Sequence, residues 1–366
     1  MDPLVESTGR DVAPRVSIVL PAYNGARTIR IALESLAAQD YPISEWVVVD
    51  DASVDGTSEI GENFLKSHDL PGTVLRHSEN RGLAQTLNDG VQAATGDLIL
   101  IVHQDVSLVN TDWLGKAVAR ISGDPTIAVL TGFYGIPAAD DVDFVKRSFG
   151  FLRRQFHRSP PRSREFVTFT EFKCDLIRKS ILDRYGGFPT RFRICGEDIV
   201  LCFLIRGDGG RIVKYYDLPT VQRFTGHAET ISGNLYKEFR FGEALGGIVL
   251  MFRTFAFREL GSSKYAKSRS LHRATQPFVA ATAFVLLVLS IIPGMIFAPA
   301  LLGALIIVRF GYYTWRLWPD FRSSVNSPSL AALQTLGASS LGLMSDVSYS
   351  LGLTAGVLRT AAGAPL

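Results

Sequence analysis

The first hundred residues contain four short runs of β-branched and apolar residues, and the segments between them have the residue pattern of helices. The runs are Val16–Leu20, Trp46–Val49, Thr73–Arg76 and Leu98–Val102, and the helices are expected at 29–37, 57–66 and 82–94. The apolar runs are continuous rather than alternating, which is typical of strands buried on both faces of a sheet. The pattern therefore predicts a Rossmann-like, doubly wound α/β domain with a mostly parallel sheet.

Acidic residues follow two of these runs, and a further acidic pair comes later in the chain. Asp50 and Asp51 close the second run, Asp105 follows the fourth, and Glu197 and Asp198 come after Gly196. The carboxyl ends of parallel strands converge on one crevice, where a divalent cation held by carboxylates can meet a diphosphate. Each acid taken singly is equally well explained as a turn former or helix N-cap, but together they favour a site for a nucleotide diphosphate.

Composition excludes several other classes of protein. The formal charge of +3 is small, and no basic stripe points to nucleic acid. The three cysteines, Cys174, Cys195 and Cys202, lack metal-type spacing and are expected to be reduced thiols. The first 15 residues are not an apolar secretory signal, so we expect the α/β domain to stay in the cytoplasm.

Five sequence blocks, in order along the chain, resemble the successive signatures of family 2 glycosyltransferases with the GT-A fold. The blocks cover 16–39, 46–57, 80–106, 172–188 and 196–212. The likeness extends over about residues 16 to 215. It implies a GT-A catalytic domain that transfers a sugar from a nucleotide-diphosphate sugar.

The resemblance also implies which residues bind the donor. Asp50 and Asp51 match acids near the base and ribose, and the loop after the first strand lines the nucleotide pocket. The donor-binding residues implied in this way are Pro21, Ala22, Tyr23, Asn24, Asp50, Asp51, Arg81, Gly82, His103, Gln104 and Asp105.

A divalent metal, Mn²⁺ or Mg²⁺, is the expected cofactor because the leaving diphosphate must be neutralised. Asp105 matches the last acid of the family's Asp-x-Asp motif, and His227 matches a downstream histidine that can approach the metal. For His227, an ordinary hydrogen-bonded loop histidine is an equally good explanation. His103 replaces the first motif aspartate, and it either favours Mn²⁺ as a ligand or binds the donor sugar and leaves the metal to Asp105.

The predicted catalytic residues are Asp198 and its neighbour Glu197. Asp198 matches the base of the family's Glu-Asp motif, which takes the proton of the acceptor hydroxyl. A single in-line displacement would invert the configuration at the anomeric carbon.

After the α/β domain, the sequence changes character. Basic and aromatic residues alternate between 236 and 275, as in a helix on the anionic cytoplasmic leaflet, although a solvated helix face is the alternative. Between Gln276 and Trp318 the only charged residues are Arg309 and Arg316, which predicts a transmembrane hairpin or a re-entrant one. Small residues in 329–358 favour a third membrane helix.

These assignments divide the chain into a tail (1–14), a glycosyltransferase domain (15–235), an interfacial segment (236–275), a hairpin (276–318) and a third membrane helix (329–358). The expected protein is integral to the plasma membrane, with its catalytic domain in the cytoplasm. It would transfer a sugar, as a hexosyl- or rhamnosyltransferase does, to a lipid-linked saccharide. The alternatives are a polyprenyl-phosphate sugar synthase and a non-catalytic, nucleotide-sugar-binding membrane scaffold.

Overall fold

The computed structural model describes residues 13–134, 143–153, 163–192, 196–223, 230–262 and 297–363, together with residues 282 and 286. Contacts between residues divide the chain into two compact units. Unit 1 comprises Met1–Gly135 and Arg158–Arg223, and unit 2 comprises Ile136–His157 and Phe224–Leu366. The two units are described separately.

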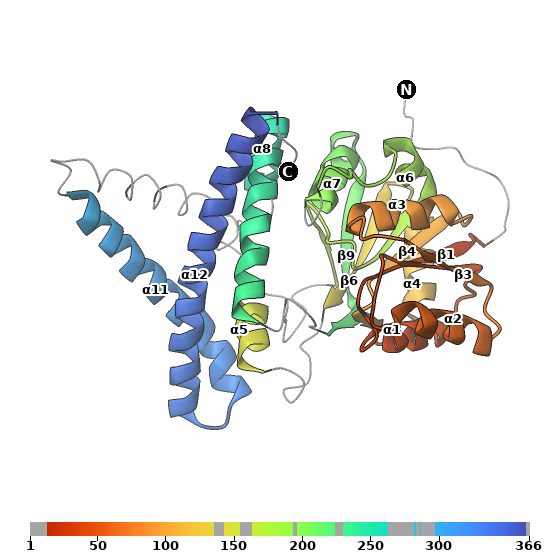
Figure 1. The fold of residues 1–366 in the computed structure, drawn as a ribbon, viewed down its shortest axis with the longest axis horizontal. Helices are drawn as coiled ribbons and strands as arrows, with labels where there is room; N and C mark the ends of the chain where they lie inside the picture. Colours follow the sequence, from red (N-terminus) through yellow and green to blue (C-terminus); the bar gives the residue numbers. More distant parts are fainter. Residues whose placement is uncertain are drawn as a thin grey trace. The chain divides into compact units, whose positions relative to one another are not determined.

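Unit 1 is an α/β domain built on a single sheet (Figure 1). Its strands are β1 (Val16–Ala22), β2 (Glu45–Asp50), β3 (Gly72–Arg76), β4 (Leu98–Val102), β5 (Val106–Leu108), β6 (Ile127–Tyr134), β7 (Arg164–Phe166), β8 (Cys174–Arg178) and β9 (Arg211–Gln222). Its helices are α1 (Ile29–Ala37), α2 (Thr57–Ser67), α3 (Leu83–Ala93), α4 (Trp113–Gly123), α6 (Lys179–Tyr185) and α7 (Glu197–Gly207).

The strand order is β3-β2-β1-β4-β8-β6-β9-β5, with β7 paired to β9. The pairs β3–β2, β2–β1 and β1–β4 are parallel, as is β6–β9. Strand β8 is antiparallel to both β4 and β6, and β5 and β7 are antiparallel to β9. The predicted doubly wound α/β fold is confirmed, and the added antiparallel pairs make the sheet a mixed one.

Both faces of the central strands are buried, which explains why their apolar runs do not alternate with polar residues. Ile18 and Leu20 of β1 pack in one core cluster with Leu33 of α1 and Trp113 of α4. Val19 faces the other way and belongs to a second cluster, which contains residues of α3, α6 and α7. Figure 1 shows these helix groups on opposite faces of the sheet.

Unit 2 is helical in its described part. It contains α5 (Phe144–Arg153), α8 (Ile231–Ser262), α11 (Phe297–Ser324) and α12 (Pro328–Ala361). Helix α5 falls in the stretch that the sequence assigns to the 15–235 domain, but its apolar side chains pack with those of α11 and α12. Between β6 and β7 the chain enters unit 2 and then returns to unit 1. No pattern in the sequence indicates this change of unit.

Glycines let α8 and α12 approach each other closely. A Cβ atom on Gly352 would lie 1.9 Å from the carbonyl oxygen of Phe239, and one on Gly356 would lie 1.9 Å from that of Glu243. On the facing helix, a Cβ on Gly242 would lie 2.1 Å from the carbonyl oxygen of Tyr349. The spacing of four residues between Gly352 and Gly356 is the small-residue motif by which helices pack backbone to backbone.

Replacing Gly352 with alanine should therefore separate α8 from α12. The added methyl group would meet backbone rather than a movable side chain, so we expect the free energy of unfolding to fall by about 2 kcal/mol. Gly303 in α11 is the matched control because nothing lies within 4 Å of its Cβ position. Thermal unfolding of both variants in detergent tests this, and equal midpoints for the two would contradict the close packing.

The hairpin of α11 and α12 has a polar contact in its interior. Nε of Arg309 donates to Oδ2 of Asp346 at 2.8 Å, and the hydroxyl of Tyr313 donates to Oδ1 of Asp346 at 2.9 Å. Paired charges are the usual way in which ionisable residues are accommodated between apolar helices. Arg309 and Asp346, which stand out in the sequence as charges within apolar stretches, thus neutralise each other.

By length and composition, α12 is a candidate membrane span among the described helices; its mean hydropathy is 1.2 over the most apolar window. It covers the segment 329–358 predicted as a third membrane helix. Helix α11 covers the second half of the predicted hairpin, and apart from residues 282 and 286 the segment 276–296 lies outside the described residues. Membrane insertion of these segments and the domain limits drawn from the sequence remain predictions.

Candidate active site

The loops after β1, β2 and β4 are tied together at the carboxyl edge of the sheet. The N–H of Tyr23 donates to Oε1 of Gln104, and Nε2 of Gln104 donates back to the Tyr23 carbonyl, both at 2.9 Å. The side-chain oxygen of Asn24 accepts the N–H of Val54 at 3.0 Å, and the backbone N–H of Asn24 donates to the hydroxyl of Ser53 at 2.8 Å. The predicted donor-binding residues Tyr23 and Gln104 therefore lie side by side, and Asn24 is held by the loop after β2.

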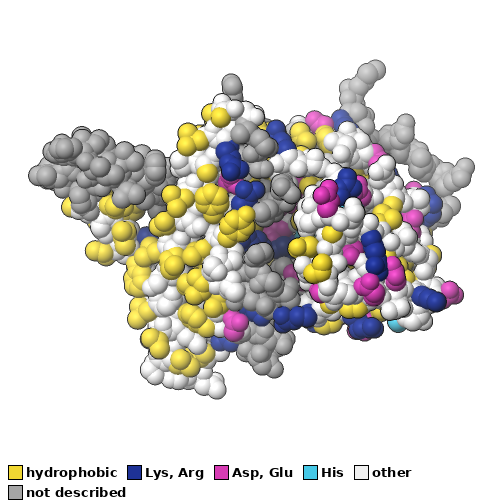
Figure 2. All heavy atoms as spheres, in the orientation of Figure 1, with side chains coloured by type: hydrophobic (Ala, Val, Ile, Leu, Met, Phe, Trp, Pro, Cys, Tyr) yellow, Lys and Arg dark blue, Asp and Glu magenta, His cyan; other side chains and the backbone are white. Residues whose placement is uncertain are grey.

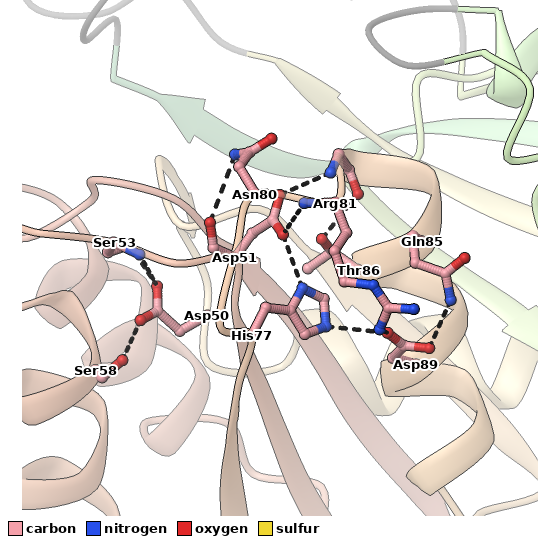
Figure 3. Close-up of polar contacts among 11 residues, drawn as sticks. Asp50, Asp51, Ser53, Ser58, His77, Asn80, Arg81, Gln85, Thr86 and Asp89 are labelled. Carbon is pink, nitrogen blue, oxygen red and sulfur yellow. Dashed lines mark hydrogen bonds and ion pairs between the residues drawn. The ribbon is translucent and has the colours of Figure 1, made fainter.

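Asp50 is the last residue of β2, and its buried carboxylate stabilises the loop that follows the strand. Oδ1 accepts the N–H and the hydroxyl of Ser53, and Oδ2 accepts the hydroxyl of Ser58 in α2 (Figure 3). These bonds fix the turn in which Ala52 takes a φ of 63°. The predicted contact of Asp50 with the base or ribose remains a prediction.

Asp51 holds the loop that begins α3 (Figure 3). Oδ1 accepts the N–H of Arg81 at 2.7 Å, and Oδ2 accepts the N–H of Gly82 at 2.9 Å. Nδ1 of His77 lies 2.7 Å from Oδ1 of Asp51, and Nε2 of the same ring lies at an ion-pair distance of 3.0 Å from Asp89. The carboxylate thus positions Arg81 and Gly82, two residues predicted to contact the donor.

The His103–Asp105 turn after β4 is held by two other strands. The N–H of His103 donates to the carbonyl of Lys173 at 2.9 Å, just before β8. At the end of β9, Nε2 of Gln222 donates to Oδ2 of Asp105 at 2.9 Å, and the N–H of Arg223 donates to its carbonyl at 2.7 Å. The predicted metal-binding carboxylate therefore has a fixed orientation.

Glu197 and Asp198 are the first two residues of α7, and both are buried. Burial and the negative charge of Glu171 raise the pKa of Asp198 to about 6, against the lowering effect of the Ile199 and Gly196 N–H groups and of Lys173. A carboxylate with such a pKa is mostly ionised at neutral pH and still basic enough to take a proton. This is the electrostatic environment that a general base needs.

Some residues of this region had not been singled out from the sequence. Gln222 binds Asp105 and is itself bound by Lys173, the charges of Glu171 and Lys173 act on Asp198, and His77 organises the Asp51 loop. Lys173 lies in a block that resembles the family, but the block itself gives it no role. His227 and Cys195 lie outside the described residues, so the predicted metal-binding role of His227 stays a prediction.

The sheet and its loops define unit 1 as a GT-A domain. Residues 17–186 match the family model described as glycosyl transferase family 2. The glycosyltransferase AglE of Haloferax volcanii is 28% identical over 188 residues, which are 51% of this chain and 59% of that protein. The putative glycosyltransferase EpsH of Bacillus subtilis is 32% identical over 189 residues, which are 49% of this chain and 51% of that protein. The match to glycosyl transferase family 2 therefore covers residues 17–186 of this chain.

Solved structures agree on the fold. The mannosyltransferase PcManGT from Pyrobaculum calidifontis, solved in complex with GDP-Man and Mn²⁺, superposes with a TM-score of 0.53 at 22% identity. The alignment covers 96% of this chain and 88% of that one, and at this identity it supports the fold alone. The chain spans about half the length of the curated relatives named above.

Proposed function

We propose that this protein is a membrane-bound inverting glycosyltransferase. It moves a sugar, as a hexosyl- or rhamnosyltransferase, from a nucleotide-diphosphate sugar to a lipid-linked saccharide at the cytoplasmic face of the plasma membrane. The observation that carries the proposal is Asp198, a buried carboxylate at the start of α7 whose pKa is raised to about 6.

The state of Asp198 favours a hydroxyl acceptor. A sugar hydroxyl loses its proton as it attacks the anomeric carbon, and a positioned base with a pKa near the working pH takes that proton most effectively. A phosphate acceptor is already ionised and needs no such base. The carboxylate therefore supports an oligosaccharide acceptor over the alternative of a polyprenyl-phosphate sugar synthase.

The tied loops after β1, β2 and β4 support a donor site at the carboxyl edge of the sheet. Tyr23 is half exposed there, next to Gln104, which fits a residue available to a ligand. PcManGT, whose fold is similar, was solved with GDP-Man and Mn²⁺, and we propose a ligand of the same class for this chain. We assign Pro21 to Asn24, Asp50, Asp51, Arg81, Gly82 and His103 to Asp105 to donor binding.

The residues near Asp105 fit a divalent metal that is bound jointly by the protein and by the phosphate oxygens of the donor. Among the described residues no group of three or more His, Cys, Asp or Glu side chains forms a metal cage. Mg²⁺ in nucleotide sites is usually held by one or two carboxylates together with phosphate oxygens, and the fixed Asp105 carboxylate supplies such a ligand. Asp105, with His227 as the second proposed ligand, would hold Mn²⁺ or Mg²⁺. The metal would neutralise charge on the leaving diphosphate.

The C-terminal helices support attachment to a membrane. Figure 2 shows hydrophobic side chains gathered over the surface of α11 and α12. Ile307, Val308 and Trp315 of α11 and Leu333 and Val347 of α12 are all strongly exposed. Large exposed apolar surfaces mark interaction sites, and the length and composition of α12 suit a bilayer. An acceptor linked to a lipid would then reach the domain from the same membrane.

Replacing Asp105 with alanine should weaken metal-dependent donor binding. We expect the donor Kd in the presence of Mn²⁺ to rise by at least about tenfold. A polar interaction with a charged group, such as the Asp105 carboxylate, contributes on the order of 1.5–3 kcal/mol to the free energy of binding. Isothermal titration with and without EDTA measures this, with Asp112→Ala on the exposed N-terminus of α4 as a control. Equal donor affinity in wild type and variant, with or without metal, would remove Asp105 from the site.

The chemistry of the product tests the acceptor class. A sugar on a lipid phosphate is a glycosyl phosphodiester, which mild acid hydrolyses, whereas a sugar on a saccharide hydroxyl is a stable glycoside. We expect the newly transferred sugar to stay with the saccharide after mild acid releases that saccharide from its lipid. Release of the labelled sugar as a monosaccharide would favour the polyprenyl-phosphate alternative.

A further inference from the structure

We propose that Lys173 and Glu171 form a positioning pair that couples the donor side of the site to the base on its acceptor side. The inference rests on the proposed function and concerns two residues outside the motif acids. It starts from Lys173, which is the one lysine in the set of buried side chains within the described part of the chain.

An ammonium group is rarely buried unless it is paired. The Nζ atom of Lys173 forms an ion pair with the carboxylate of Glu171, and the Lys173 side chain is 9% exposed. The two residues lie in the segment before β8, where the carbonyl of Lys173 accepts the N–H of His103 and the carbonyl of Thr170 accepts the thiol of Cys202 in α7. An ion pair in which only the lysine is buried adds little stability by itself, so its position points to another use.

On the donor side, Lys173 acts through Gln222 on Asp105. Nζ of Lys173 donates to Oε1 of Gln222 at 3.4 Å, and Nε2 of Gln222 donates to Oδ2 of Asp105 at 2.9 Å. The backbone carbonyl of Lys173 also accepts the N–H of His103 at 2.9 Å. Side chain and backbone of one residue thus hold both ends of the His103–Asp105 turn.

On the acceptor side, both members of the pair act on Asp198. The negative charge of Glu171 raises the pKa of Asp198, and the positive charge of Lys173 lowers it. Cys202 in α7 also lies within the electrostatic reach of Asp198, but its own pKa is raised well above the usual value, so it stays neutral. The balance between Glu171 and Lys173 therefore helps to set the pH at which the base becomes active.

The pair predicts opposite effects for its two members. The acid limb is the pH range in which kcat/KM rises as Asp198 ionises. In Glu171→Gln this limb should move to lower pH, because a neighbouring negative charge is lost. In Lys173→Met it should move to higher pH, because a positive charge is lost, and each shift should be about one unit. At a pH below the limb, the Lys173→Met variant should then be on the order of tenfold less active, because the ionised fraction of Asp198 falls by that factor. In addition, Lys173→Met should raise the KM for the donor, since Gln222 loses its partner.

Three further variants separate this role from a merely structural one. The double variant Glu171→Gln/Lys173→Met leaves no unpaired buried charge, and its acid limb should lie between those of the single variants. Lys173→Arg keeps the charge and should keep the wild-type limb. Lys179→Met is the matched control, because Lys179 pairs with Asp183 at 2.7 Å on a more exposed part of α6.

The titration of Asp198 is also followed directly, by carboxyl-carbon NMR of the detergent-purified protein with Asp198→Asn as the assignment control. Midpoints that move down in Glu171→Gln and up in Lys173→Met are expected. The inference would be overturned, even if transfer is observed, by Asp198 midpoints in the two variants that equal the wild-type midpoint or that shift in the same direction. If the midpoints move as expected but the wild-type protein transfers no sugar, the positioning pair stands and the proposed function fails.

Discussion

Replacement of Asp198 by asparagine is expected to lower kcat for sugar transfer by about three orders of magnitude. The side chain keeps its size and loses only its ability to take the acceptor proton. Donor binding should stay within a few-fold, because the donor loops after β1, β2 and β4 are held by contacts that do not involve Asp198. Initial rates at saturating donor, with a separate titration of donor binding, measure both quantities.

The same assignment predicts the pH dependence of the wild-type enzyme. Asp198 must be ionised to act, and its pKa is raised to about 6. The rate should therefore be low below pH 6, rise through that value and level off above it. Asp208→Asn, at the opposite end of α7, is the control and should keep both the rate and the profile. A rate that survives in Asp198→Asn, or a loss of donor affinity in that variant, would place Asp198 outside the base role.

Replacement of Asp51 by alanine is expected to lower the free energy of unfolding by about 3 kcal/mol, because it leaves three part-buried donors without an acceptor. Those donors are the N–H groups of Arg81 and Gly82 and the ring of His77. The loop that begins α3 should then lose its fixed conformation. Because that loop is assigned to the donor, the donor Kd should rise by at least about tenfold as the loop has to be ordered on binding.

Denaturant unfolding and donor titration on the same preparation test the two effects. The matched control is Asp112→Ala, whose ion pair with Lys116 is exposed and should contribute no more than about 0.5 kcal/mol. Weaker donor binding with unchanged stability would show instead that Asp51 acts mainly by touching the donor. Unchanged values for both would contradict the positioning role.

The first half of the α/β domain was predictable from the sequence because its strands are buried on both faces. Runs such as Leu98–Val102 have no polar interruption, and the helices between them show clear apolar spacing. Strand β8 lacks that signal, since Asp175 sits inside it with a carboxylate that accepts the hydroxyl of Thr170. Its antiparallel pairing with β4 and β6 depends on tertiary contacts that no local pattern records.

The candidate site was predictable where residues stand at the ends of strands. Asp50 and Asp105 could be found in this way and Asp198 from the resemblance to the family, but the contacts that orient them could not. Gln222 reaches Asp105 because β9 runs antiparallel to β5, with Gln222 opposite Val106. That register follows from the assembly of the sheet, so no local pattern in the sequence connects Gln222 with Asp105.

The most direct test of the account is transfer by the detergent-purified protein from a panel of UDP-, GDP- and dTDP-sugars, with Mn²⁺, Mg²⁺ or EDTA and a polar lipid extract. We expect metal-dependent turnover of one donor into an organic-extractable product, and loss of that product in Asp198→Asn. Donor binding without transfer across the whole panel would contradict the account and would favour a non-catalytic, nucleotide-sugar-binding protein.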